Sequence, residues 1–185
     1  IEVAPWQQKI EYGDTILCLG SCFASNIGER LAERKFSVSI NPTGILFNPA
    51  SIASTVERIG AKKLVTADDV FNSDGRWLSY DFHSSLSGAT LGEAVDVINR
   101  QIASSNELLK RANYLIITLG TAWVYRLCSS NDVVANCHKQ PHSTFRRELM
   151  SVAEIVDSLE CIISCTTAHI VLTVSPIRHL GEGLA

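Results

Sequence analysis

The sequence lacks the features that assign a protein at once to the membrane or to nucleic acid. No segment reaches the run of roughly 18 apolar residues that a membrane-spanning helix needs, so we expect no membrane partner. The net charge is −3, and the basic pairs Lys62-Lys63 and Arg146-Arg147 are isolated, which excludes the electrostatic footprint of a nucleic-acid-binding protein. We predict both pairs to be solvated surface. A charged content of 19% beside 46% hydrophobic residues is typical of a folded domain.

Cysteine occurs at six positions, but without the spacing of a metal site or a disulfide framework. Cys18 and Cys22 are four residues apart, as are Cys161 and Cys165, and neither pair has the Cys-x-x-Cys spacing of a zinc site. We therefore expect no metal and no cofactor. Reduced thiols favour a cytoplasmic location. The chain begins at Ile1 with no apolar signal segment after it, so we expect a trimmed N-terminus.

The most informative stretch is the junction between a predicted strand and a predicted helix. An apolar run of strand length ends at Gly20-Ser21, and helical periodicity begins at Cys22. Such a corner places the Ser21 hydroxyl at the end of a sheet, beside the unpaired N–H groups of a helix N-terminus. Serine hydrolases position a nucleophile and part of an oxyanion hole in this way. The alternative is that Ser21 only caps the helix.

Apolar strands alternate with amphipathic helices along the rest of the chain. This alternation predicts an α/β fold with a mostly parallel sheet and right-handed crossovers. Residues 61–90 are less regular, and we expect an insertion or lid there. The remaining predicted elements are strands at 36–40, 113–120 and 169–174, helices near 52–60, 91–111 and 151–164, and a hairpin across 129–131. Ser151 and Glu154 have the spacing of a capping box at the start of the last of these helices.

Several blocks resemble one known family. The string Gly20-Ser21-Cys22-Phe23-Ala24 spells the signature of the GSCFA family, and residues 41–49, 120–125, 136–139 and 175–179 look like further family blocks in family order. This family is similar to the SGNH (GDSL-like) hydrolases. The resemblance implies one domain over residues 1–185, lacking its C-terminal segment, with a three-layer α/β/α, flavodoxin-like sandwich. It also implies a serine esterase acting on an acyl ester or an O-acetylated carbohydrate.

The candidate site follows from the topology. In an open parallel sheet, ligands bind beyond the carboxyl ends of the strands, so the loops at 20–21, 120–123 and 175–179 should meet at one edge. Ser21 is the candidate nucleophile. By resemblance to the SGNH pattern, the backbone N–H groups of Ser21 and Gly44 would hold the oxyanion, although Gly44 could also be only a turn residue with positive φ.

Two departures from the SGNH pattern affect the catalytic prediction. Gly120-Thr121-Ala122-Trp123 stands where those enzymes have Gly-x-Asn-Asp, so Thr121 or a backbone amide would have to replace the asparagine donor. No Asp-x-x-His block supplies a base in this chain. Either that block lies in a missing C-terminal segment, or His179 serves, unless His179 is only a surface residue.

Other residues are candidates for lining the site. We expect Gly120 and Trp123 there, with Tyr125 completing an aromatic wall unless one of the two rings is ordinary core. His83 and His138 either line the pocket or hold the insertion in place. Cys22 is a rival nucleophile, because a helix N-terminus favours a thiolate. A binding module for carbohydrate or another small ligand is the alternative function, and the oligomeric state is left open.

Overall fold

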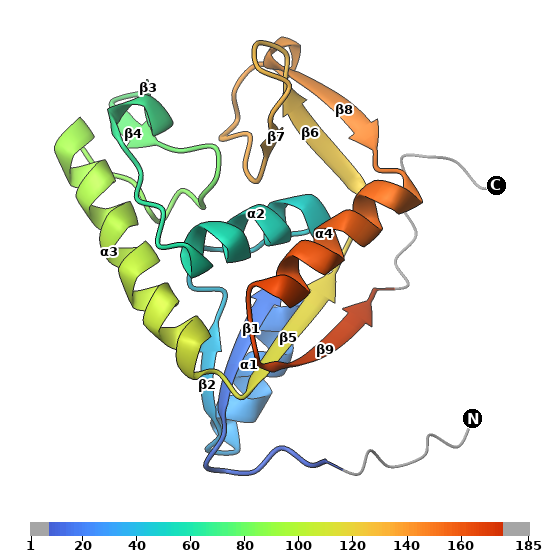
Figure 1. Cartoon of the computed structure of the whole chain (residues 1–185). Coiled ribbons are helices and arrows are strands. Elements are labelled where there is room, and N and C mark those ends of the chain that lie inside the picture. The colour runs from blue at the N-terminus through green and yellow to red at the C-terminus, as the bar shows by residue number, and fades with distance from the viewer. Residues whose placement is uncertain (1–7, 176–185) are drawn as a thin grey trace.

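The centre of the molecule is a four-stranded parallel sheet. The computed structural model describes residues 8–175, and its sheet contains β1 (Thr15–Gly20), β2 (Ser37–Ile40), β5 (Tyr114–Leu119) and β9 (His169–Val174). The strands lie in the order β2-β1-β5-β9, and all neighbours are parallel (Figure 1). The predicted α/β class with a mostly parallel sheet is therefore confirmed.

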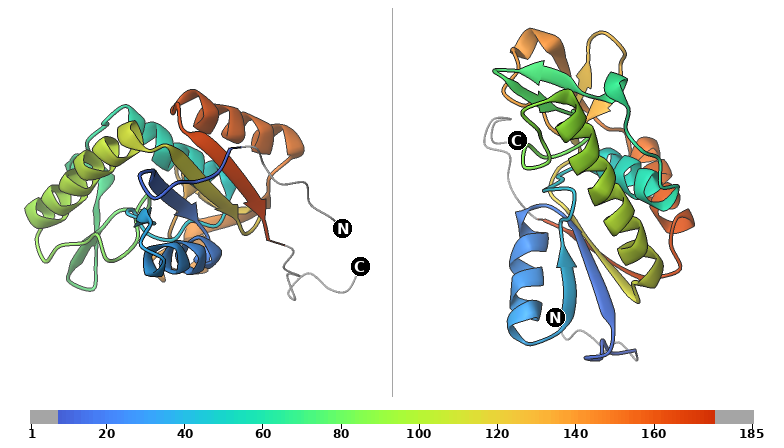
Figure 2. Two further views of the ribbon diagram at one scale, coloured as in Figure 1. Left: turned by 90° about the horizontal axis from the view of Figure 1, so that it is seen from below. Right: turned by 90° about the vertical axis from the view of Figure 1, so that its left-hand side faces the viewer.

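Helices cover both faces of this sheet. In β1 the side chains alternate: Ile16 and Cys18 belong to one apolar cluster with Ala24 of α1 (Cys22–Glu33). Leu17 and Leu19 belong to the opposite cluster, which the other helices supply. These are α2 (Pro49–Gly60), α3 (Leu91–Arg111) and α4 (Val152–Ser164). Figure 2 shows α1 on one side of the strands and the other three helices on the other side. Coverage on both faces explains the continuous apolar runs of β1 and β5, whose residues are nearly all buried.

Capping residues fix where these helices begin. Ser151 and Glu154 form a capping box at the start of α4, as their spacing predicted, and Thr90 and Glu93 do the same for α3. The Asn48 side chain caps α2 by accepting from the Ser51 amide at 2.8 Å. Among residues 8–175, no helix combines the length and apolar character needed to cross a lipid bilayer.

Residues 61–90 form a folded segment packed against α3. They contain a 3₁₀ turn (Ala67–Asp69) and an antiparallel hairpin of β3 (Phe71–Ser73) and β4 (Arg76–Leu78). Phe82 is 2% exposed and joins Ile98 and Ile102 of α3 in a separate apolar cluster. Asp81 pairs with Arg58 of α2 at 2.9 Å. Burial raises the pKa of Asp81, an effect that Arg58 opposes. Whether the segment acts as a lid stays a prediction.

A second, antiparallel sheet lies beyond the carboxyl ends of the parallel strands (Figure 1). It contains β6 (Trp123–Leu127), β7 (Val133–Val134) and β8 (Phe145–Leu149), in the order β7-β6-β8. The predicted hairpin is confirmed as β6 and β7. The third strand, β8, was not predicted. A short 3₁₀ turn (His142–Thr144) precedes it.

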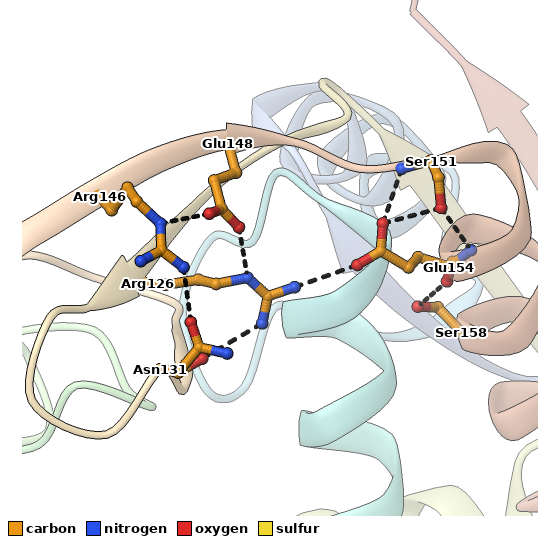
Figure 3. Close-up of polar contacts among 7 residues, drawn as sticks. All are labelled: Arg126, Asn131, Arg146, Glu148, Ser151, Glu154 and Ser158. Atoms are coloured by element: carbon orange, nitrogen blue, oxygen red, sulfur yellow. Dashed lines mark hydrogen bonds and ion pairs between the residues drawn. The ribbon is translucent and has the colours of Figure 1, made fainter.

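A polar network holds this second sheet against the start of α4 (Figure 3). Arg126 of β6 pairs with Glu148 of β8 at 2.9 Å and with Glu154 of α4 at 3.2 Å. Arg146 pairs with the other oxygen of Glu148 and donates to the Asn131 side chain at 2.7 Å. Because Glu154 also caps α4, Arg126 connects the capped end of a helix with two strands. The network fixes the position of β6, which carries two of the predicted site residues.

Candidate functional site

Ser21 lies at the junction of β1 and α1. It is the N-cap of α1, and its Oγ accepts from the Phe23 amide at 3.3 Å. The same Oγ lies 3.0 Å from the hydroxyl of Thr118 on the neighbouring strand β5. Only 3% of Ser21 is exposed. The predicted strand-to-helix corner and the capping contact are therefore both present, and the capping contact leaves the hydroxyl proton available to another partner.

The turn after β2 is held against this corner by Asn41. Asn41 has a positive φ of 41°, and its side-chain oxygen accepts from the Gly20 amide at 2.9 Å. Its side-chain nitrogen donates to Ser25 of α1 at 3.0 Å. One amide side chain thus connects the end of β1, the first helix and the turn that contains Gly44.

Both amides expected to hold an oxyanion already donate within the protein. The Ser21 N–H donates to the carbonyl and the hydroxyl of Thr118 at 3.1 and 3.0 Å. The Gly44 N–H donates to the Asn41 carbonyl at 2.8 Å. A role for either amide in binding an oxyanion stays a prediction, and it requires these hydrogen bonds to be exchanged.

A cavity of about 690 Å³ opens beside Ser21. Seven of the residues predicted for the site line it together: Ser21, Cys22, His83, Gly120, Thr121, Trp123 and Tyr125. The other described residues that line it are Ile45, Phe47, Asn48, Val134, Ala135, Asn136, Cys137 and Arg147. None of these is Asp or Glu, so among the described lining residues the charged group is the guanidinium of Arg147.

One wall of the cavity is aromatic and carries a cation. Trp123 and Tyr125 lie two residues apart on β6, so they share a face of that strand, and both line the cavity. The guanidinium of Arg147, on β8, stacks over the Trp123 ring at 3.8 Å. Both arginines of the pair Arg146-Arg147 are exposed, as predicted, and β8 places Arg147 on this wall.

Gly120 and Thr121 bring β5 close to the serine. Their amides both donate to the Phe47 carbonyl, at 2.9 and 3.0 Å. A Cβ at Gly120 would lie 3.3 Å from the Cβ of Ser21, so a larger residue there would press on the candidate nucleophile. The Thr121 hydroxyl accepts from the Trp123 amide at 3.0 Å, which leaves its proton free to donate.

His83 faces the cavity from the inserted segment. Its backbone N–H donates to the Thr43 carbonyl at 3.2 Å, in the turn that contains Gly44. A Cβ at Gly44, where φ is +102°, would lie 2.1 Å from the Cβ of His83. Glycine at position 44 is thus required both by its conformation and by the approach of His83.

His138 lies elsewhere, outside the described lining of the cavity. Its Nε2 donates to the Ser79 carbonyl at 2.8 Å, and its ring lies near those of Phe71 and Tyr80. Of the two roles that the sequence allowed, this geometry favours holding the insertion in place. The remaining candidate, His179, lies outside the described residues.

The burial of His138 predicts a pH dependence of stability. Burial lowers the pKa of His138 from its ordinary 6.5, and this outweighs the bond to the Ser79 carbonyl, which acts in the opposite direction. The unfolded chain therefore binds this proton more tightly, so stability falls as the pH drops below 6.5 and is unaffected by His138 above it. Urea unfolding of wild type and His138→Gln at about pH 7.5 and about pH 5.5 checks this. The glutamine keeps an N–H donor but does not titrate, so we expect a smaller acid loss in the variant; equal losses would contradict the prediction.

Several residues of the site were missed by reasoning from the sequence. Thr118 was considered only as part of a buried strand, and Phe47 only as part of a family block. Arg147 gave no signal, because β8 itself was not recognised. Thr118 could have been found from the topology, since parallel strands of similar length bring their last residues side by side.

The fold and the site define an α/β protein in which a serine caps the helix after the first strand and faces a cavity at the carboxyl edge of the sheet. The model of the GSCFA family matches residues 15–185, so the chain belongs to the GSCFA family. No curated protein and no solved structure matches the chain.

Proposed function

We propose that this GSCFA-family protein is an SGNH-like serine hydrolase that cleaves an ester, with Ser21 as its nucleophile. The observation that carries the proposal is the position of Ser21, which follows β1, caps α1 and lines a cavity of about 690 Å³. A helix N-terminus and an adjacent ligand-sized cavity are two features that a serine nucleophile uses.

The proposed reaction has two displacement steps. The Ser21 Oγ forms a bond to the ester carbonyl carbon, its proton passes to a histidine acting as base, and the ester C–O bond breaks as that proton moves to the leaving alcohol. Water then cleaves the acyl-serine, which releases the acid and restores the hydroxyl. His179 remains the candidate base within this sequence.

The substrate class is a small acyl ester or an O-acetylated carbohydrate. The aromatic wall of Trp123 and Tyr125 suits either a sugar ring or an acyl group. The apolar clusters on both faces of the sheet support the three-layer, flavodoxin-like arrangement of the SGNH hydrolases. A cytoplasmic location is part of the proposal, and the six free cysteines are consistent with it.

Covalent labelling tests the proposal directly. We expect a fluorophosphonate probe to react with Ser21 of the full-length protein, and mass spectrometry of the digested adduct to locate the label there. A fluorophosphonate reacts with activated serines, whereas a serine that only caps a helix should not react. Ser21→Ala should abolish the label.

Cys22 provides the internal control for this experiment. Cys22 lines the same cavity and is exposed, so a small alkylating reagent should reach it. Alkylation at Cys22 without phosphonylation at Ser21 would contradict the proposal of a serine hydrolase and favour thiol chemistry. The absence of both reactions in a folded protein would also contradict the proposal.

A binding module is the second candidate function. Two observations favour this function: the Ser21 hydroxyl lies within hydrogen-bond distance of the Thr118 hydroxyl, and no histidine of the described residues bonds to the Ser21 hydroxyl. The Ser21 and Gly44 amides also donate within the protein. A module of this kind should bind acetylated sugars in calorimetry without releasing acetate.

A further inference from the structure

We propose that His83 supplies an oxyanion-hole donor through its Nε2–H, in place of the asparagine that the SGNH pattern has and this chain lacks. The inference rests on the proposed function, and it assigns a role to a residue of the inserted segment. Its chemistry is that of a neutral imidazole donating a hydrogen bond to the developing oxyanion.

The need for another donor follows from the hydrogen bonds at the corner. The Ser21 amide has two acceptors on Thr118, and the Gly44 amide has the Asn41 carbonyl. An oxyanion hole works because its donors are in place before charge develops, so donors that must first break other bonds lose much of their effect. A side-chain donor that has no acceptor within the protein avoids this cost.

His83 is held beside the turn that contains Gly44. Its backbone bonds to the Thr43 carbonyl, and its Cβ lies against Gly44, the glycine that was predicted to hold the oxyanion. The following turn is closed by the Leu86 amide, which donates to the His83 carbonyl at 2.9 Å. Both sides of His83 are thus fixed by backbone bonds, while the residue lines the cavity that also contains Ser21.

The hydrogen bonds of the ring select one tautomer. The Ser85 backbone N–H donates to Nδ1 of His83 at 3.2 Å, and the Ser85 hydroxyl lies 3.0 Å from the same nitrogen. A nitrogen that accepts from a backbone N–H carries no proton, so the proton of the neutral ring is on Nε2. Nε2 makes no hydrogen bond to another described residue. His83, a lining residue of the cavity, therefore carries an Nε2–H with no acceptor among the described residues, whereas a general base would need the opposite tautomer.

Kinetics of three substitutions at one position separate a donor from a base. With p-nitrophenyl acetate as the probe, we expect His83→Ala to lower kcat about 10²–10³-fold with a small change in KM. His83→Gln and His83→Asn keep an N–H donor but cannot accept a proton. Their kcat should therefore be at least about tenfold higher than that of His83→Ala. All three variants keep the Cβ that packs on Gly44, and a thermal melt confirms that they fold.

Matched controls and outcomes complete the test. His142→Gln removes an exposed histidine that is not among the described lining residues of the cavity, and it should behave as wild type. The inference would be overturned if kcat of His83→Ala were within about twofold of wild type. It would also be overturned if His83→Gln and His83→Asn had a kcat as low as that of His83→Ala. If wild type shows neither turnover nor labelling at Ser21, the proposed function itself fails; an active wild type with an unaffected His83→Ala removes only the role of His83.

Discussion

Replacing Gly20 by alanine is expected to destabilise the protein by more than about 4 kcal/mol, or to prevent folding altogether. Gly20 has φ +131°, a conformation that L side chains rarely adopt. An added Cβ would lie 2.2 Å from the Thr118 backbone oxygen and 2.9 Å from its nitrogen. Because these atoms belong to the hydrogen-bonded strand β5, neither can move away without disturbing the sheet. Urea unfolding followed by circular dichroism measures the effect.

Gly75 offers a matched control for this prediction. It also has a positive φ, +77°, but a Cβ there would meet nothing within 4 Å. Gly75→Ala therefore adds backbone strain without a steric clash, and we expect a loss of about 1 kcal/mol. Equal losses at the two positions would show that strain alone accounts for the effect at Gly20, contrary to our explanation.

The demands on Gly20 follow from the way the site is built. The Ser21 amide donates to Thr118 of β5, and the Gly20 amide donates to Asn41 in the turn after β2, so one neighbouring strand and one turn both bond to the Gly20-Ser21 dipeptide. This crowding orients the Ser21 hydroxyl. The bond to Thr118 also occupies the Ser21 amide, one of the two amides predicted to hold an oxyanion.

Elements with strong local signals could be predicted from the sequence. The long helix at residues 91–111 appears with the same bounds as α3, because its apolar period and its charged last turn are both local properties. The capping box of α4 was predicted from two residues, Ser151 and Glu154. The meeting of the loops after β1 and β5 at one cavity followed from parallel topology alone.

Elements that depend on distant partners could not be predicted. The strand β8 has the sequence Phe145-Arg146-Arg147-Glu148-Leu149, in which three charged residues hide any alternation. It exists because β6 pairs with it and because Arg126 bonds to Glu148. Its position then decides that Arg147 stacks on Trp123, which no pattern near residue 147 indicates. Long-range pairing of this kind overrides local propensity.

The hydrogen bonds of the candidate oxyanion-hole donors could not be predicted from the sequence either. A motif identifies which residues meet, but the acceptor of each amide depends on distances of a few tenths of an ångström. The Gly44 amide bonds to a carbonyl three residues earlier, within its own turn. The tautomer of His83 depends on Ser85, two residues later, whose backbone approaches only because the chain turns there.

Replacing Ser21 by glycine is expected to abolish hydrolysis while leaving the fold intact. Loss of a serine nucleophile lowers kcat by about 10⁴-fold or more. Glycine is a tolerated N-cap, so the capping loss should be a few tenths of a kcal/mol, against about 1 kcal/mol for Ser21→Ala. The backbone of Ser21 is extended, with φ −68° and ψ 178°, which glycine adopts without strain. Hydrolysis of p-nitrophenyl acetate and urea unfolding of the same preparations measure both effects.

Ser151→Ala separates the two roles that a capping serine can have. Ser151 caps α4 as Ser21 caps α1, with its hydroxyl accepting from a helix amide, but it is exposed and does not line the cavity. We expect Ser151→Ala to lower stability by an amount comparable to Ser21→Ala and to leave kcat at the wild-type value. If wild type hydrolyses the ester and Ser21→Gly still does so at a similar rate, Ser21 is a cap only, and the reaction must be assigned to another group on the cavity, with Cys22 the next to test.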